Sequence, residues 1–100
     1  MEECRPSSIN ENFSVIKSTR VDLATSSTAY LLPPYPLPNR KRLIIYNSQN
    51  YDLYIGGSDL TVSNGFIIPP GGYLVLALPN NVYGTFQTIS ATTIRILELA

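Results

Sequence analysis

Turn-forming residues interrupt this sequence at short intervals, and that spacing constrains the fold more than any other feature. Clusters of Gly, Pro, Asn and Asp recur roughly every 8–12 residues between segments rich in Val, Ile, Leu, Tyr and Thr. Such segments suit strands, whereas the residues that fill helix surfaces, Ala, Glu and Lys, are sparse. The sequence therefore predicts an all-β fold, a single-domain antiparallel β-sandwich or jelly-roll-like fold.

The domain organisation follows from length and local pattern. A chain of 100 residues is expected to form one domain. Residues 1–12 show no periodic apolar pattern and include Pro6, so we expect an extended N-terminal arm, followed by a β-sandwich domain over residues 13–100. The arm is predicted either to order on docking to a partner or to be a plain tail. Its acidic, polar start is unlike a secretory signal, and no apolar run has the length of a membrane span.

Two apolar runs lead to specific expectations about the sheets. Residues 43–46 are predicted to form a strand buried on both faces that makes a hairpin with residues 51–55. Residues 73–78 form the most apolar segment and are predicted to be a central strand. Further strands are expected at residues 13–23 (one or two strands), 28–32, 66–68, 82–86 and 93–99, with a polyproline-like crossing at residues 33–38.

Two turns are predicted from their dipeptides. Asn64 and Gly65 both tolerate a positive φ, which favours a tight turn at that point. Pro70 and Gly71 fit the two central positions of a type II turn.

The composition argues against enzymatic chemistry. The chain has no histidine, and its single cysteine, Cys4, has no activating neighbour apart from Arg5. Asp52 and Asp59 are interpreted as turn residues rather than as a catalytic or calcium-binding carboxylate pair. We therefore expect no enzyme activity and no catalytic, cofactor-binding or metal-binding residues.

The distribution of charge identifies candidate contacts with a partner. The formal net charge is zero, so no nucleic-acid or membrane partner is expected, and the only basic cluster is Arg40, Lys41 and Arg42. This cluster is interpreted as the solvated start of a strand or as a contact for an acidic patch on a protein partner. No charged residue lies between Asp59 and Arg95, and Tyr73 and Val75 face away from the leucines that alternate with them. Because that strand is apolar on both faces, we expect part of it to be covered by another subunit in a homo-oligomer.

Several short motifs follow one another in a recognisable order: Arg42–Ser48, Tyr54–Thr61, Ser63–Phe66, Pro69–Gly72 and Ile94–Glu98. Their order resembles that of small β-rich virion proteins of tailed bacteriophages. The resemblance covers about residues 40–99 and departs at Ile67-Ile68-Pro69, where the usual pattern has Pro-Leu. These motifs are strand and turn motifs, so they indicate the fold more specifically than the function.

The resemblance implies a non-enzymatic structural protein of a phage particle. Within that class, a capsid decoration (cement) protein fits a short, neutral sandwich best. Such a protein is assembled in the host cytoplasm, lies on the capsid surface and bridges subunits of the major capsid protein. A trimer is favoured over a dimer, because capsid lattices present three-fold positions. The alternative is a head-fibre, tail or baseplate module that binds a glycan or another host-surface ligand, and an exposed row of tyrosines would favour it.

Overall fold

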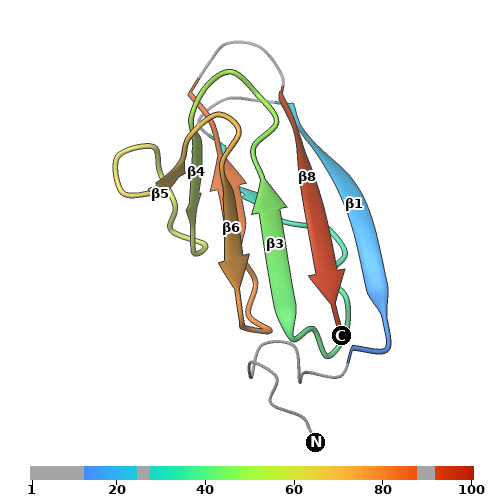
Figure 1. The fold of residues 1–100 in the computed structure, drawn as a ribbon. Helices are drawn as coiled ribbons and strands as arrows, with labels where there is room; N and C mark the ends of the chain where they lie inside the picture. The colour runs from blue at the N-terminus through green and yellow to red at the C-terminus, as the bar shows by residue number, and fades with distance from the viewer. Residues whose placement is uncertain (1–12, 25–27, 88–91) are drawn as a thin grey trace, which may run out of the picture.

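A computed structural model describes residues 13–24, 28–87 and 92–100, whose strands form two four-stranded antiparallel sheets (Figure 1). This arrangement confirms the predicted all-β sandwich. The arm expected at residues 1–12 lies outside the described residues. The strands are β1 (Ile16–Leu23), β2 (Tyr30–Leu31), β3 (Arg42–Tyr46), β4 (Leu53–Gly56), β5 (Phe66–Ile68), β6 (Tyr73–Leu76), β7 (Tyr83–Thr85) and β8 (Thr92–Leu99).

The strand order identifies the sandwich as a jelly roll. The front sheet, which faces the viewer in Figure 1, has the order β1-β8-β3-β6, and the back sheet has the order β2-β7-β4-β5. The pairs β1–β8, β2–β7, β3–β6 and β4–β5 are nested one inside the next, as in one long hairpin. Folding that hairpin across two sheets produces the jelly-roll arrangement of eight strands.

The core lies between the two sheets and follows the two-residue period of the strands. In the front sheet, alternate residues of β3 and β8 point inward, and they meet inward residues of β4 and β5 in the back sheet. Phe86 and Leu32, both almost fully buried, fill the space beside them. The inward residues of these four strands are Leu43, Ile45, Ile94, Ile96, Leu53, Ile55 and Ile68.

A buried asparagine joins the two sheets at the end of β3. The side-chain amide of Asn47 donates to the carbonyl oxygens of Tyr51 and Ile68 at 2.8 and 2.9 Å. Its Oδ1 accepts from the backbone N–H of Gln49 at 3.0 Å. These bonds hold the β3–β4 connection against the end of β5.

The structure corrects two expectations about residues 43–46 and 51–55. β3 is buried on one face only, because Ile44 is half-buried and Tyr46 is 42% exposed on the other face. β3 and β4 do not form a hairpin, since β3 belongs to the front sheet and β4 to the back sheet. The polar residues between them therefore carry the chain across the sandwich.

Residues 73–78 also differ from their prediction as a central strand. β6 covers only Tyr73–Leu76 and forms the edge of the front sheet next to β3. Leu74 packs against the core, whereas Tyr73 and Val75 are 69% and 48% exposed on the outer face. Apolar residues on both faces of this segment therefore did not indicate that the strand has a neighbouring strand on each side within its sheet.

The two predicted turns have different geometries. Gly71 has a φ of 77°, and the N–H of Gly72 donates to the carbonyl of Pro69 at 2.9 Å, as in a type II turn. At the other site, neither Asn64 nor Gly65 has a positive φ, which corrects the expected conformation.

Asn64 ends its turn instead of occupying its centre. Its N–H donates to the carbonyl of Thr61, and its Oδ1 accepts from the N–H of Thr61 at 2.8 Å. Gly65 is required for a different reason, because an added Cβ would lie 2.7 Å from the Cβ of Tyr54. Close packing therefore selects this glycine.

The proline-rich segment connects the two sheets. It carries the chain from β2 in the back sheet to β3 in the front sheet, as a crossing should. The chain bends at residues 32–35 and turns at residues 38–39, so it is not extended throughout. Asn39 at that turn has a φ of 58°, a conformation that asparagine tolerates better than most residues.

Candidate interaction surfaces

The basic cluster Arg40, Lys41 and Arg42 is not one surface. Arg40 is buried, and its Nη1 lies 3.0 Å from Oε2 of Glu98, whose side chain is fully buried. The same guanidinium donates to the carbonyls of Leu78 and Asn80. Arg40 is thus a structural residue rather than a partner contact, which corrects that expectation.

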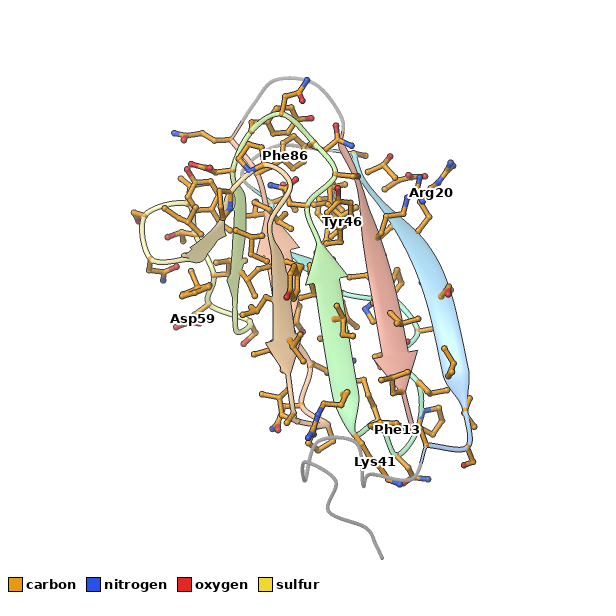
Figure 2. The ribbon with its side chains drawn as sticks, in the orientation of Figure 1. Phe13, Arg20, Lys41, Tyr46, Asp59 and Phe86 are labelled. Carbon is orange, nitrogen blue, oxygen red and sulfur yellow. The ribbon has the colours of Figure 1, made fainter. Side chains whose placement is uncertain are left out.

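The other two residues of the cluster point to separate places. Lys41 is exposed just before β3 (Figure 2), and its N–H donates to the carbonyl of Leu99 at 2.7 Å. Arg42 is half-buried on β3. The sequence cluster therefore supplies one exposed lysine and one partly exposed arginine instead of a continuous basic patch.

A row of polar and aromatic side chains crosses the outer face of the front sheet. Strand register places Arg20 of β1 opposite Arg95 of β8, Arg95 opposite Tyr46 of β3, and Tyr46 opposite Tyr73 of β6. Alternate residues of a strand share a face, so the next row runs parallel to the first and is mostly apolar. Its members are Ser18, Leu97, Ile44 and Val75.

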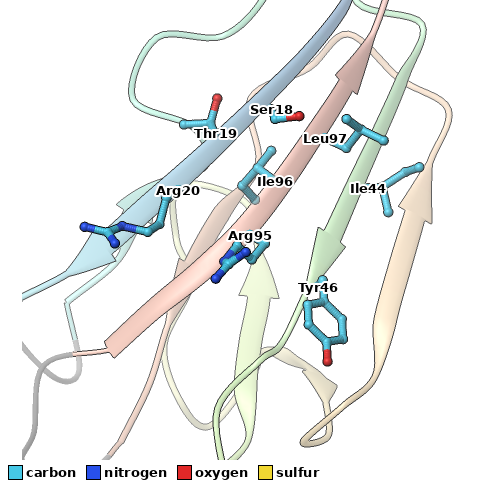
Figure 3. A pocket seen from close by; sticks show the side chains of 8 residues that line it. All are labelled: Ser18, Thr19, Arg20, Ile44, Tyr46, Arg95, Ile96 and Leu97. Atoms are coloured by element: carbon cyan, nitrogen blue, oxygen red, sulfur yellow. The ribbon is translucent and has the colours of Figure 1, made fainter.

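These rows border an open groove of about 590 Å³. Figure 3 shows Arg20 and Arg95 on adjacent strands, with the Tyr46 ring on β3 beyond Arg95. The side chain of Arg20 is 68% exposed, and its Nε lies 3.8 Å from Oδ1 of Asp22, a distance typical of a weak surface pair. Arg95 is exposed and has no acidic partner within salt-bridge distance in the described part of the chain.

The arrangement of this row is suited to binding a carboxylate. Arg20 and Arg95 are cross-strand neighbours of like charge, and Asp22 beside Arg20 offsets only one of the two positive charges. A bound anion would offset the other. A guanidinium group forms paired hydrogen bonds with a carboxylate, and a neighbouring aromatic ring packs on its apolar part. The groove is open, so it fits a group that projects from a larger partner.

Sequence reasoning missed Arg20 and Arg95 as a pair. They belong to strands at opposite ends of the chain, and only the β1–β8 register brings them together. The available signal was that both are charged residues within segments otherwise suited to strands. That signal indicates exposure but does not identify a partner.

A second, apolar surface lies along the side of the sandwich where β5 and β6 form the edges of their sheets. Three exposed side chains border it, Phe66 and Ile67 of β5 and Tyr73 of β6, and Val75 is exposed next to it on the outer face of β6. A groove of about 400 Å³ opens between the sheets here and a second one of about 420 Å³ follows the β5–β6 turn. Tyr73 and Val75, predicted as partner contacts, therefore do lie on or next to an accessible apolar surface.

The described residues contain no arrangement that indicates metal binding. No group of three or more metal-ligating side chains lies together within residues 13–24, 28–87 and 92–100. Asp52 and Asp59 line none of the three grooves described above. Cys4 lies outside the described part of the chain. Within the residues that the structure describes, no helix is both long and apolar enough to cross a bilayer.

Comparisons with known proteins do not identify a relative. No protein-family model matches this chain, and searches of curated proteins and of solved structures give no match.

Proposed function

We propose that this protein is a non-enzymatic structural protein of a phage particle that binds the outside of the capsid shell as a decoration protein. The observation that carries the proposal is the outer face of the front sheet. There an open groove presents two exposed arginines beside an apolar row. Such a surface fits a protein partner with exposed carboxylates better than it fits a small substrate, because the groove is shallow and open.

Two further considerations support this proposal. The motif order of residues 40–99 resembles phage virion proteins, and viral capsid proteins are among the proteins built on jelly rolls. The shared jelly-roll fold is an analogy in architecture alone, so it fits a viral particle but does not by itself indicate a function. In the proposed mechanism, a protein that binds the assembled shell and not its dissociated subunits stabilises the shell by mass action.

The experiment compares purified shells with and without the bound protein. We expect the decorated shells to survive higher temperature or stronger osmotic shock, and mass spectrometry to find the protein in them. Replacing both Arg20→Gln and Arg95→Gln should weaken binding at least tenfold, since each arginine would lose a charge-assisted hydrogen bond. Lys17→Gln is the matched control, because Lys17 lies on the same strand as Arg20 and donates to the carbonyl of Tyr35. Equal resistance of the two kinds of shell contradicts the proposal.

One observation favours a second function, a glycan-binding module of a tail or head fibre. Tyr46 and Tyr73 lie opposite each other on β3 and β6 and are 42% and 69% exposed. Adjacent exposed aromatic rings can stack on sugar rings, and the neighbouring arginines would favour an acidic sugar. A glycan array distinguishes the two functions. Selective binding that Tyr46→Ala and Tyr73→Ala abolish supports the module, whereas an array without binding supports shell attachment.

A further inference from the structure

We propose that β6 pairs antiparallel with β6 of a second copy of this chain across a two-fold axis. The two front sheets then join into one continuous eight-stranded sheet. This inference rests on the edge of the sandwich and does not depend on the proposed function.

One edge of β6 has hydrogen-bonding groups that no described strand uses. The N–H of Asn47 donates to the carbonyl of Gly72 at 2.9 Å, where β3 meets the start of β6. Hydrogen-bonded pairs alternate along an antiparallel ladder, so the backbone groups of Leu74 and Leu76 face β3. The N–H and C=O groups of Tyr73 and Val75 therefore face outward, and no strand within the described residues pairs with them.

The side chains of β6 carry no charge that would oppose pairing, although the strand is only four residues long and both Gly71 and Gly72 form hydrogen bonds with Asn47 just before it. Natural edge strands carry charged residues, prolines or bulges that prevent association with another chain. The opposite edge of the front sheet, β1, carries Lys17, Arg20 and Asp22. β6 has the sequence Tyr-Leu-Val-Leu, without charge or proline.

An apolar surface lies beside that edge. The groove of about 400 Å³ between the sheets is lined mainly by apolar residues, among them Leu74 and Leu76. Phe66, 62% exposed, borders the same groove from β5. A strand added to β6 covers this groove with its own inward side chains, so the exposed apolar area on both partners is removed from water.

A second copy of this chain is the occupant that matches this edge. A two-fold axis that runs midway between Val75 and the Val75 of the second copy places these two residues opposite each other on the outer face and Leu74 opposite Leu76 on the inner face. These residues thus meet residues of similar chemistry, as a self-complementary interface requires. The stretch between Asp59 and Arg95 holds no charged residue, so no charge of this stretch repels its copy.

The main experiment measures self-association of the whole chain by light scattering and sedimentation equilibrium at micromolar concentration. We expect a dimer, twice the 11.0 kDa of one chain. Val75→Lys should raise the dissociation constant at least tenfold, because two lysines would lie directly opposite each other. Val15→Lys is the matched control, since Val15 is 44% exposed and Val75 is 48% exposed. Circular dichroism checks that each variant keeps its strand content.

A cross-link tests the register and remains informative if Val75→Lys fails to fold. Residues in a hydrogen-bonded antiparallel pair have Cα atoms about 5.5 Å apart, which suits a disulfide. In a background with Cys4→Ser, Val75→Cys should form a covalent dimer under mild oxidation, whereas Val15→Cys should not. A monomer, a trimer, or equal cross-linking through Val15 and Val75 would overturn the inference.

Discussion

Asn47 shows how much one buried side chain contributes at the residue scale. It is 1% exposed, and its amide nitrogen donates two hydrogen bonds to carbonyl oxygens on separate segments. Asn47→Asp keeps the shape but places a carboxylate oxygen against those carbonyls. We expect a loss of about 3 kcal/mol in the free energy of unfolding. Chemical denaturation measures it, and Asn50→Asp at an exposed turn position is the control that should change little. An equal effect of both substitutions would contradict this role of Asn47.

The buried ion pair leads to a second prediction at the same scale. Oε2 of Glu98 accepts from Nη1 of Arg40 at 3.0 Å and from the N–H of Leu37 at 2.9 Å. Glu98→Gln leaves the guanidinium buried without its counter-charge, so we expect a loss of about 3 kcal/mol. The double variant Arg40→Met, Glu98→Leu removes both charges and should be more stable than Glu98→Gln alone. If thermal denaturation shows the double variant to be less stable than Glu98→Gln, the ion pair stabilises the fold by more than the compensation of its two charges.

At the scale of single elements, the β5–β6 turn depends on one backbone conformation. Gly71 has a φ of 77°, and an added Cβ would contact nothing within 4 Å. Gly71→Ala therefore tests the backbone alone, and we expect it to lower the free energy of unfolding by about 1 kcal/mol. Gly57→Ala is the control, because Gly57 has no positive φ and its added Cβ would meet only Oδ1 of Asp59 at 3.4 Å. A loss of similar size in both variants would show that φ is not the cause.

The strands themselves were largely predictable from sequence, whereas their pairing was not. Alternating apolar residues located β4, and a β-branched start located β8, because both signals are local properties of the sequence. The position of β6 at an edge was missed, since an apolar run does not reveal which strands lie on either side of it. The role of Arg40 was missed for a related reason. Its partner, Glu98, is 58 residues away, so no local pattern distinguishes a buried arginine from an exposed one.

The candidate surfaces also differ in how far the sequence alone could predict them. Tyr73 and Val75 were predicted as contacts because their strand is apolar on both faces, and the structure places them on an accessible surface. Arg20 and Arg95 become neighbours only through the register of two distant strands. Surfaces made by one strand can thus be anticipated, whereas those assembled from several strands require the structure.

At the scale of the whole molecule, the two proposed surfaces should respond differently to salt. Raising NaCl from about 0.1 M to about 1 M shortens the Debye length from about 10 Å to about 3 Å. Attachment through Arg20 and Arg95 should therefore weaken, while association through the uncharged β6 edge should persist or strengthen. Sedimentation of the free protein and co-sedimentation with shells at both salt concentrations measure the two effects. Shell binding that is insensitive to salt would argue against the arginine row, and salt-sensitive self-association would argue against the β6 edge.

The nesting of the strand pairs also sets an order in which the chain can fold. β4 and β5 are close in sequence, so joining them closes a short loop at a small entropic cost. Once they have paired, β3 and β6 are held near each other, followed by β2 with β7 and finally β1 with β8. We therefore expect strand pairing to proceed outward from the centre of the sequence towards both ends. Pulsed hydrogen exchange during refolding should then protect amides of β4 before those of β1.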